Sequence, residues 1–170
     1  MKKILSLLLI TALFLSIFGG TGCKNLSAST SKYKIVCTLT DDMAVEGIET
    51  FTYFNQDEVP HDTLKFNLFG NAFRKGAKYS PINVQYQANA YPNGISYGEM
   101  SILSVKENGK DIEFLVGGED QNVLTIKLLD EVYPDASTKI EIKFTLKLAD
   151  VIARTGYNKK TINLGNFYPI

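Results

Sequence analysis

Side chains that metal and covalent catalysis use are scarce in this sequence. It has one histidine, His61, two cysteines, Cys23 and Cys37, and no tryptophan. A catalytic zinc ion usually takes three protein ligands from His, Cys, Asp and Glu, and no H-E-x-x-H motif is present. A Ser-His-Asp triad uses a histidine as the base of its serine nucleophile, and the single histidine of this sequence gives no support for one. The sequence therefore predicts no catalytic residue, no metal ligand and no cofactor in this chain.

A net charge is also lacking. The chain carries 18 basic and 18 acidic side chains. Without its first 23 residues, which include Lys2 and Lys3 but no acidic side chain, the balance is 16 basic against 18 acidic, a net of −2. This balance gives no electrostatic footprint for nucleic acid and no polybasic patch for anionic lipid, so we expect no nucleic-acid partner.

The single histidine lies in an acidic loop. His61 follows Pro60 and is flanked by Asp57 and Asp62. Together with Asn55, this loop offers the oxygen ligands that calcium uses, but the spacing of an EF-hand is absent. We therefore interpret His61 as a solvated loop residue.

The first 32 residues indicate export and attachment to a membrane. Two lysines precede a nearly uninterrupted apolar run over 4–18, and small residues follow up to Cys23. This order is typical of a secretory signal peptide over 1–22, and the run is shorter than the roughly 20 residues of a spanning helix. Thr21-Gly22-Cys23 resembles the lipobox of bacterial lipoproteins, although Gly20 replaces the usual aliphatic residue. The resemblance implies that Cys23 carries lipid and anchors the chain at the extracytoplasmic face of the bacterial cell envelope.

Residues 23–32 are small and polar and predict a flexible tether, which leaves 33–170 as one domain. With Cys23 acylated, Cys37 is the remaining thiol. It lies on the same face of a predicted strand as Tyr33, Ile35 and Leu39. We interpret it as a buried structural cysteine.

The domain is predicted to be all-β. Residues 139–148 alternate strictly between polar and apolar side chains, which indicates a strand with one buried face. Asn108-Gly109 between two apolar runs predicts a hairpin. The pattern indicates further strands at 33–40, 44–54 (apolar on both faces), 64–68, 82–87, 99–105, 111–116 and 124–128. Strands joined by short turns favour an antiparallel β-sandwich or a saddle-like curved sheet.

The sequence leaves open whether the chain has a ligand site or a carboxylate pair. Tyr79, Tyr86, Tyr91 and Tyr97 cluster around two long loops, and such an aromatic platform would suit a glycan or a peptide. The other interpretation is ordinary loop packing, which the lack of tryptophan favours. A pair of carboxylates for glycoside hydrolysis is a third hypothesis. The sequence does not exclude it, because the distance between two carboxylates depends on the three-dimensional structure.

Three segments, in order, resemble the amino-terminal β-domain of M1-family zinc aminopeptidases. They are the strand at 33–35 that leads to a second strand ending in Asn55, the run 64–74, which is similar to F-x-L-x-x-N-A-F, and the segments 154–156 and 162–169. The resemblance implies a saddle-like β-domain that packs on a zinc-bearing catalytic domain. The catalytic motifs of that family are absent from this sequence, and Arg154 is expected to pair locally.

The resemblance leads to a functional expectation. We expect a lipid-anchored, non-catalytic β-domain that is truncated at its C-terminal end, or the product of a split gene, and that packs on a separate M1-like catalytic domain in trans. Zinc would belong to that absent domain. The alternative is a surface lipoprotein that binds a peptide or a glycan.

Overall fold

The computed structural model describes residues 30–170. Its strands are β1 (Lys32–Leu39), β2 (Ala44–Phe54), β3 (His61–Asn67), β4 (Glu99–Glu107), β5 (Lys110–Asp111), β6 (Phe114–Gly117), β7 (Val123–Val132), β8 (Ser137–Lys147), β9 (Thr155–Tyr157) and β10 (Ile162–Leu164). Short helical turns are η2 (Phe69–Phe73), η3 (Val84–Tyr86) and α2 (Gln87–Ala90).

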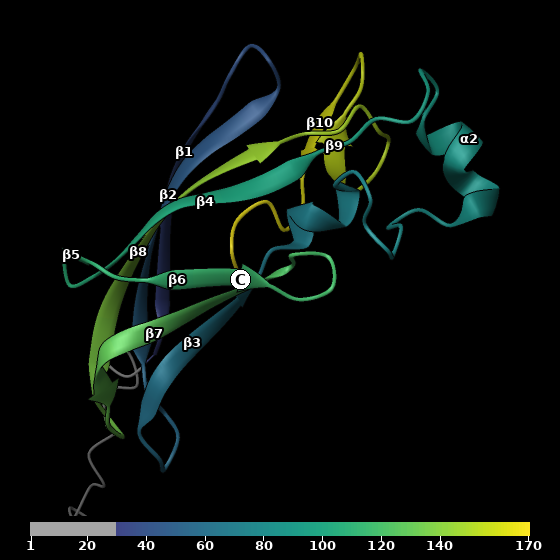
Figure 1. The fold of residues 1–170 in the computed structure, drawn as a ribbon. Coiled ribbons are helices and arrows are strands. Elements are labelled where there is room, and N and C mark those ends of the chain that lie inside the picture. The colour runs from purple at the N-terminus through teal and green to yellow at the C-terminus, as the bar shows by residue number, and fades with distance from the viewer. Residues whose placement is uncertain (1–29) are drawn as a thin grey trace, which may run out of the picture.

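The strands form two facing antiparallel sheets and a small hairpin (Figure 1). The larger sheet has the order β1-β2-β8-β4-β5, and the smaller one has the order β3-β7-β6. Among residues 30–170, strand β9 pairs with β10 alone, apart from one isolated bridge between Asp150 and Tyr157. The predicted all-β antiparallel sandwich is therefore confirmed.

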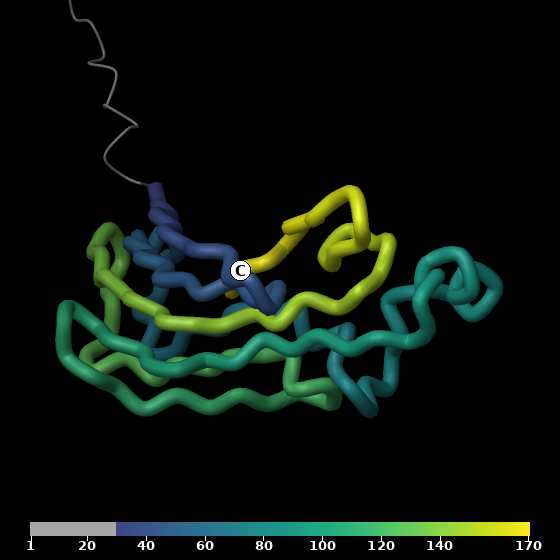
Figure 2. The backbone as a smooth tube through the Cα atoms, turned by 90° about the horizontal axis from the view of Figure 1, so that it is seen from above, coloured from purple at the N-terminus to yellow at the C-terminus, as the bar shows by residue number. Residues whose placement is uncertain are grey.

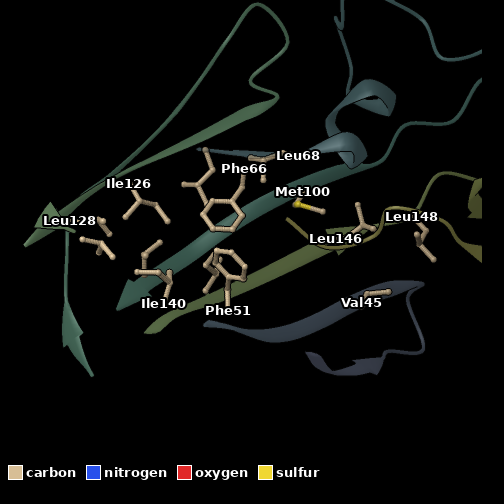
Figure 3. Close-up of a cluster of buried hydrophobic side chains, with 14 residues drawn as sticks. Val45, Phe51, Phe66, Leu68, Met100, Ile126, Leu128, Ile140, Leu146 and Leu148 are labelled. Atoms are coloured by element: carbon tan, nitrogen blue, oxygen red, sulfur yellow. The ribbon is translucent and has the colours of Figure 1, made fainter. Parts of the chain in front are cut away.

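Strand β8 is the centre of the larger sheet, because β2 pairs along one edge and β4 along the other. Its alternation follows the sequence pattern: Ile140, Ile142, Phe144 and Leu146 are buried, whereas Lys143 is exposed. The inward side chains of β8 and of its neighbour β2 meet the apolar side chains of β3 and β7. One such contact joins Phe51 of β2 and Phe66 of β3, whose rings pack edge to face with centroids 5.5 Å apart (Figure 3). Burying apolar surface on both inner faces is the main driving force for this arrangement.

The chain forms the predicted hairpin but then leaves the sheet. Asn108 and Gly109 have φ angles of 48° and 86°, the left-handed values that a two-residue turn needs. Strand β5 ends at Asp111, and the chain crosses to the smaller sheet as β6. The single strand expected over 111–116 is thus two strands in different sheets.

The strand expected over 82–87 is wrong. This segment forms η3 and the start of α2 instead. The Asn83 side chain accepts a hydrogen bond from Gln85 N at 3.3 Å and caps η3. Val84 is 79% exposed and Tyr86 is 58% exposed. The alternating apolar side chains of this segment are therefore not buried against a sheet.

Strand β1 is an edge strand, and its position overturns the prediction for Cys37. Cys37 is exposed, because the smaller sheet does not extend over the inner face of β1.

Strand β2 was expected to be apolar on both faces, but it is buried on one face only, with Glu49 among the buried residues and Glu46 and Ile48 on the exposed side.

Cys23, the predicted signal peptide and most of the predicted tether lie outside the described residues. The end of the expected tether belongs to the fold, since Ser31 Oγ accepts a hydrogen bond from Phe54 N at 3.0 Å and β1 begins at Lys32. The start of the described chain, at the purple end of the colour range, and α2 lie at opposite ends of the molecule (Figures 1 and 2). Within 30–170, no helix has the length and apolar character to cross a membrane.

Candidate binding site

The loops at one end of the sheets form a lobe, which we define as residues 69–98 and 151–166 (Figure 1). Its two segments are in contact, since Ile152 N donates a hydrogen bond to Ala90 O at 2.8 Å. A small apolar cluster lies between them. Its members are Ala90, Ala149 and Val151, with Phe73, Ile82, Tyr91 and Ala153 packed against it. The lobe therefore has a core of its own beside the sandwich.

Asn71 fixes the start of the lobe. It is buried within η2, and its side-chain amide donates to Gln121 O at 2.6 Å. Its carbonyl oxygen accepts from Met100 N at 2.7 Å. One side chain thus joins η2 to the β6–β7 turn and to β4, and each bond satisfies a buried polar group. Asn71 belongs to the F-x-L-x-x-N-A-F-like run, whose structural role the sequence did not reveal.

Asp120 holds the next segment of the lobe. Its carboxylate, buried in the β6–β7 turn, accepts hydrogen bonds from Lys78 N at 2.6 Å and Tyr79 N at 3.2 Å. Lys78 also forms an ion pair with Glu119, and the hydrogen bond to that carboxylate raises the pKa of Lys78, helped by Tyr79. These contacts fix the loop that follows η2.

The lobe contains a pocket of about 320 Å³. Phe73 and Arg74 from the end of η2 line one part of it, and Tyr91, Ile95 and Tyr97 line another. Burial, followed by the proximity of Tyr97, raises the pKa of Tyr91. The structure thus brings together two of the four tyrosines of the predicted aromatic platform, while Tyr79 and Tyr86 are exposed elsewhere on the lobe.

A second pocket of about 300 Å³ adjoins the first, because both are lined by Ala72, Phe73 and Pro81. Arg154 lines this second pocket. Its expected local ion pair is wrong, since no acidic group within residues 30–170 lies within 4.0 Å of its guanidinium. Each of the adjoining pockets therefore has one arginine in its wall.

The guanidinium of Arg74 is only weakly paired. Its Nε lies 3.8 Å from Glu99 Oε1, which is too long for a hydrogen bond. This Nε is buried and has no hydrogen-bond partner in the described part of the chain. A buried donor without a partner costs free energy, which an acceptor on a bound ligand would recover.

The loop around His61 is built differently from the solvated loop that the sequence suggested. His61 begins β3, and its Nε2 lies 2.8 Å from Asp57 Oδ2. Asn55, considered as a calcium ligand, is buried and donates to Val59 O and Val132 O, both at 2.8 Å. Within residues 30–170 there is no group of three His, Cys, Asp or Glu side chains that could hold a metal ion.

Comparisons with known proteins give the chain a limited structural likeness. No family model matches the sequence, and no curated protein matches it. Similar solved structures include the M1 zinc metallopeptidase from Deinococcus radiodurans, with a TM-score of 0.41 and 8% identity over 69% of this chain. A mutant of that enzyme gives a TM-score of 0.46 with 9% identity over 81% of this chain. Another mutant structure, bound to a Tyr-Ser-Ala substrate, gives 0.46 and 10% over 81%.

This likeness concerns the arrangement of strands and does not establish membership of a family. The chain spans 19–26% of the length of the metallopeptidase chains. The class that the structure itself defines is an all-β domain of two antiparallel sheets with a pocketed loop lobe at one end.

Proposed function

We propose that this chain is a lipid-anchored, non-catalytic β-domain that acts by packing on a separate protein domain of the M1 catalytic class. The observation that carries the proposal is the open inner face of β1. Tyr33, Ile35, Cys37 and Leu39 alternate along this face, and the smaller sheet leaves it largely uncovered. Tyr33 is 45% exposed and Leu39 is 41% exposed.

The neighbouring edge of the smaller sheet supports the same proposal. Strand β3 is the edge strand on the side of β1 and β2, as the contact between Phe66 and Phe51 indicates. Its end is already paired, because Asn67 and Ile170 exchange backbone hydrogen bonds of 2.5 and 3.1 Å, so the free part of this edge is the stretch before Asn67. An edge strand beside an exposed apolar face is a surface that proteins commonly cover with another element. The resemblance of the sequence to the M1 β-domain suggests a catalytic domain as the cover.

Activity measurements test the non-catalytic part. The purified chain, supplied with zinc and an aminoacyl fluorogenic substrate, should give no turnover above a buffer blank. Turnover that co-purifies with the chain and is abolished by a chelator would overturn this part.

Binding measurements test the packing surface. Sedimentation of the chain with a purified M1 catalytic domain from the same genome should show a complex that Leu39→Lys weakens. Val36→Lys is the matched control, because Val36 lies on the opposite face of β1 and is 61% exposed. If neither substitution, or the control alone, weakens the complex, the inner face of β1 is not the docking surface.

Fractionation of cells tests the anchor. The chain should remain with the membranes, and Cys23→Ala should release it, because acyl chains contribute about 0.8 kcal/mol per buried methylene. Equal distribution of both proteins would contradict lipid attachment.

A second candidate function is supported by the pocket between Phe73 and Tyr91. A concave site of about 320 Å³ with tyrosine walls is of the size and chemistry that bind small ligands. We propose that the lobe is a binding module for a peptide or a glycan. Screening of peptide and glycan arrays should identify ligands that the Tyr91→Ala variant no longer binds, although its unfolding temperature is unchanged. Tyr133→Ala is the control, because it removes an exposed tyrosine outside the lobe, and this variant should still bind the same ligands.

A further inference from the structure

The balanced net charge of the chain conceals an uneven distribution. The lobe carries six basic side chains and no aspartate or glutamate: Arg74, Lys75, Lys78, Arg154, Lys159 and Lys160. The other described residues carry nine basic and 18 acidic side chains, a net charge of −9. A concentration of one sign of charge around concave walls attracts ligands of the opposite sign.

Four of the six basic residues of the lobe line hollows, and two of these hollows adjoin each other. Arg74 and Arg154 line the two pockets that share Phe73 as a wall. Lys159 and Lys160 line a third hollow of about 480 Å³, together with residues from both segments of the lobe. The three hollows contain no acidic side chain in their walls.

Acidic groups do border the lobe, but they leave most of its cations unpaired. Glu119 forms an ion pair with Lys78, and Glu99 approaches Arg74 at 3.8 Å. Asp150 accepts a hydrogen bond from Asn93 Nδ2 at 3.0 Å. Within residues 30–170, the other four basic side chains of the lobe form no ion pair.

We propose that the lobe binds an acidic peptide segment, whose carboxylates pair with Arg74 and Arg154 on either side of Phe73 while its apolar side chains pack in the two adjoining pockets. Guanidinium groups bind carboxylates through charge-assisted and bidentate hydrogen bonds. The walls between the two arginines are rich in carbon, with Phe73, Pro81 and Ile82 among them. Such walls suit leucine or phenylalanine side chains better than the hydroxyl-covered ring of a sugar.

This inference rests on the second proposed function, in which the lobe is a binding module. It adds the sign of the ligand's charge and its chemical class. The lobe also lies away from the start of β1 (Figure 2), so a chain held at its N-terminus would keep the lobe at a distance from the point of attachment.

The test is fluorescence anisotropy of the full chain with a labelled short peptide that alternates glutamate with leucine. Its partner probe replaces each glutamate by glutamine, and the further probes are a sulfated glycan and oligo-dT. The glutamate peptide should bind, and its affinity should fall about tenfold or more with Arg74→Gln and with Arg154→Gln. Glu99→Gln should strengthen binding, because it removes a carboxylate that competes for Arg74.

Lys143→Gln is the matched control, since it removes the same charge from the exposed face of β8 and should leave the affinity unchanged. Unfolding temperatures of all variants separate loss of binding from loss of fold. Equal affinity for the glutamine peptide would overturn this inference while leaving a neutral-ligand module in place. Tighter binding of the sulfated glycan or oligo-dT would overturn the assignment to a peptide. Absence of binding by every probe would overturn the inference of an anionic ligand.

Discussion

Replacing the carboxyl group of Glu49 by an amide should change how the stability of the fold depends on pH. Glu49 is fully buried on β2, between Ile35 of β1 and Ile142 of β8, and neither carboxylate oxygen accepts a hydrogen bond. Burial raises the pKa of Glu49 from its usual 4.5 to about 8. The pKa of the nearby Tyr33 phenol is also raised, by burial first and then by the charges of Glu49 and Tyr168.

The direction follows from proton linkage. A carboxyl group with a raised pKa binds its proton more tightly in the folded chain than in the unfolded chain. Its contribution to stability is fully present at low pH and is lost as the pH rises toward the folded-state pKa of about 8. With about 1.36 kcal/mol for each pKa unit, the free energy of unfolding of the wild type should fall by about 3.5 kcal/mol relative to Glu49→Gln between about pH 5 and pH 8.

Urea unfolding at a series of pH values measures this difference directly. Other carboxyl groups titrate in both proteins, so their effects cancel when the two curves are subtracted. Glu46→Gln is the control, because Glu46 lies exposed on the opposite face of the same strand and its curve should run parallel to the wild type. A difference between wild type and Glu49→Gln that stays constant over this range would refute the reasoning.

Three further predictions concern the core, the lobe and the edge strand. Phe144→Ala should cost about 3–5 kcal/mol in urea unfolding, because the ring is fully buried, and Lys143→Ala should cost almost nothing; equal losses would contradict the assigned faces. Asn71→Ala should cost about 1–3 kcal/mol, because it leaves the buried N–H of Met100 without a partner and removes the part-buried bond to Gln121 O, whereas Asn83→Ala at the exposed η3 should cost less than about 1 kcal/mol. Cys37 is exposed, so it should react with a thiol reagent in the native protein as fast as in urea, and protection of the thiol would argue for a covered β1.

The strands were predictable where one face is buried, because apolar and polar residues then alternate along the sequence. The buried series from Ile140 to Leu146 is the clearest case, and the Asn108-Gly109 hairpin depends on local backbone preferences alone. The same rule failed at Cys37 and over 82–87, because alternation shows which side chains share a face but not whether another layer covers that face.

The candidate site was only partly predictable. Clustered tyrosines pointed to the loops, and two of them, Tyr91 and Tyr97, line the pocket. The residues that position the lobe, Asn71 and Asp120, act through contacts with segments distant in the sequence. No local pattern marks such contacts. The unequal division of charge could have been counted from the sequence, but only the fold shows that 69–98 and 151–166 belong to one surface.

The separation of charge between the lobe and the sheets has a practical consequence for handling the protein. Although the formal charges of the whole chain cancel, one end is cationic and the rest is anionic. At neutral pH and low ionic strength, the molecule should therefore adsorb to both cation- and anion-exchange resins, each binding a different end, and salt should elute it from both.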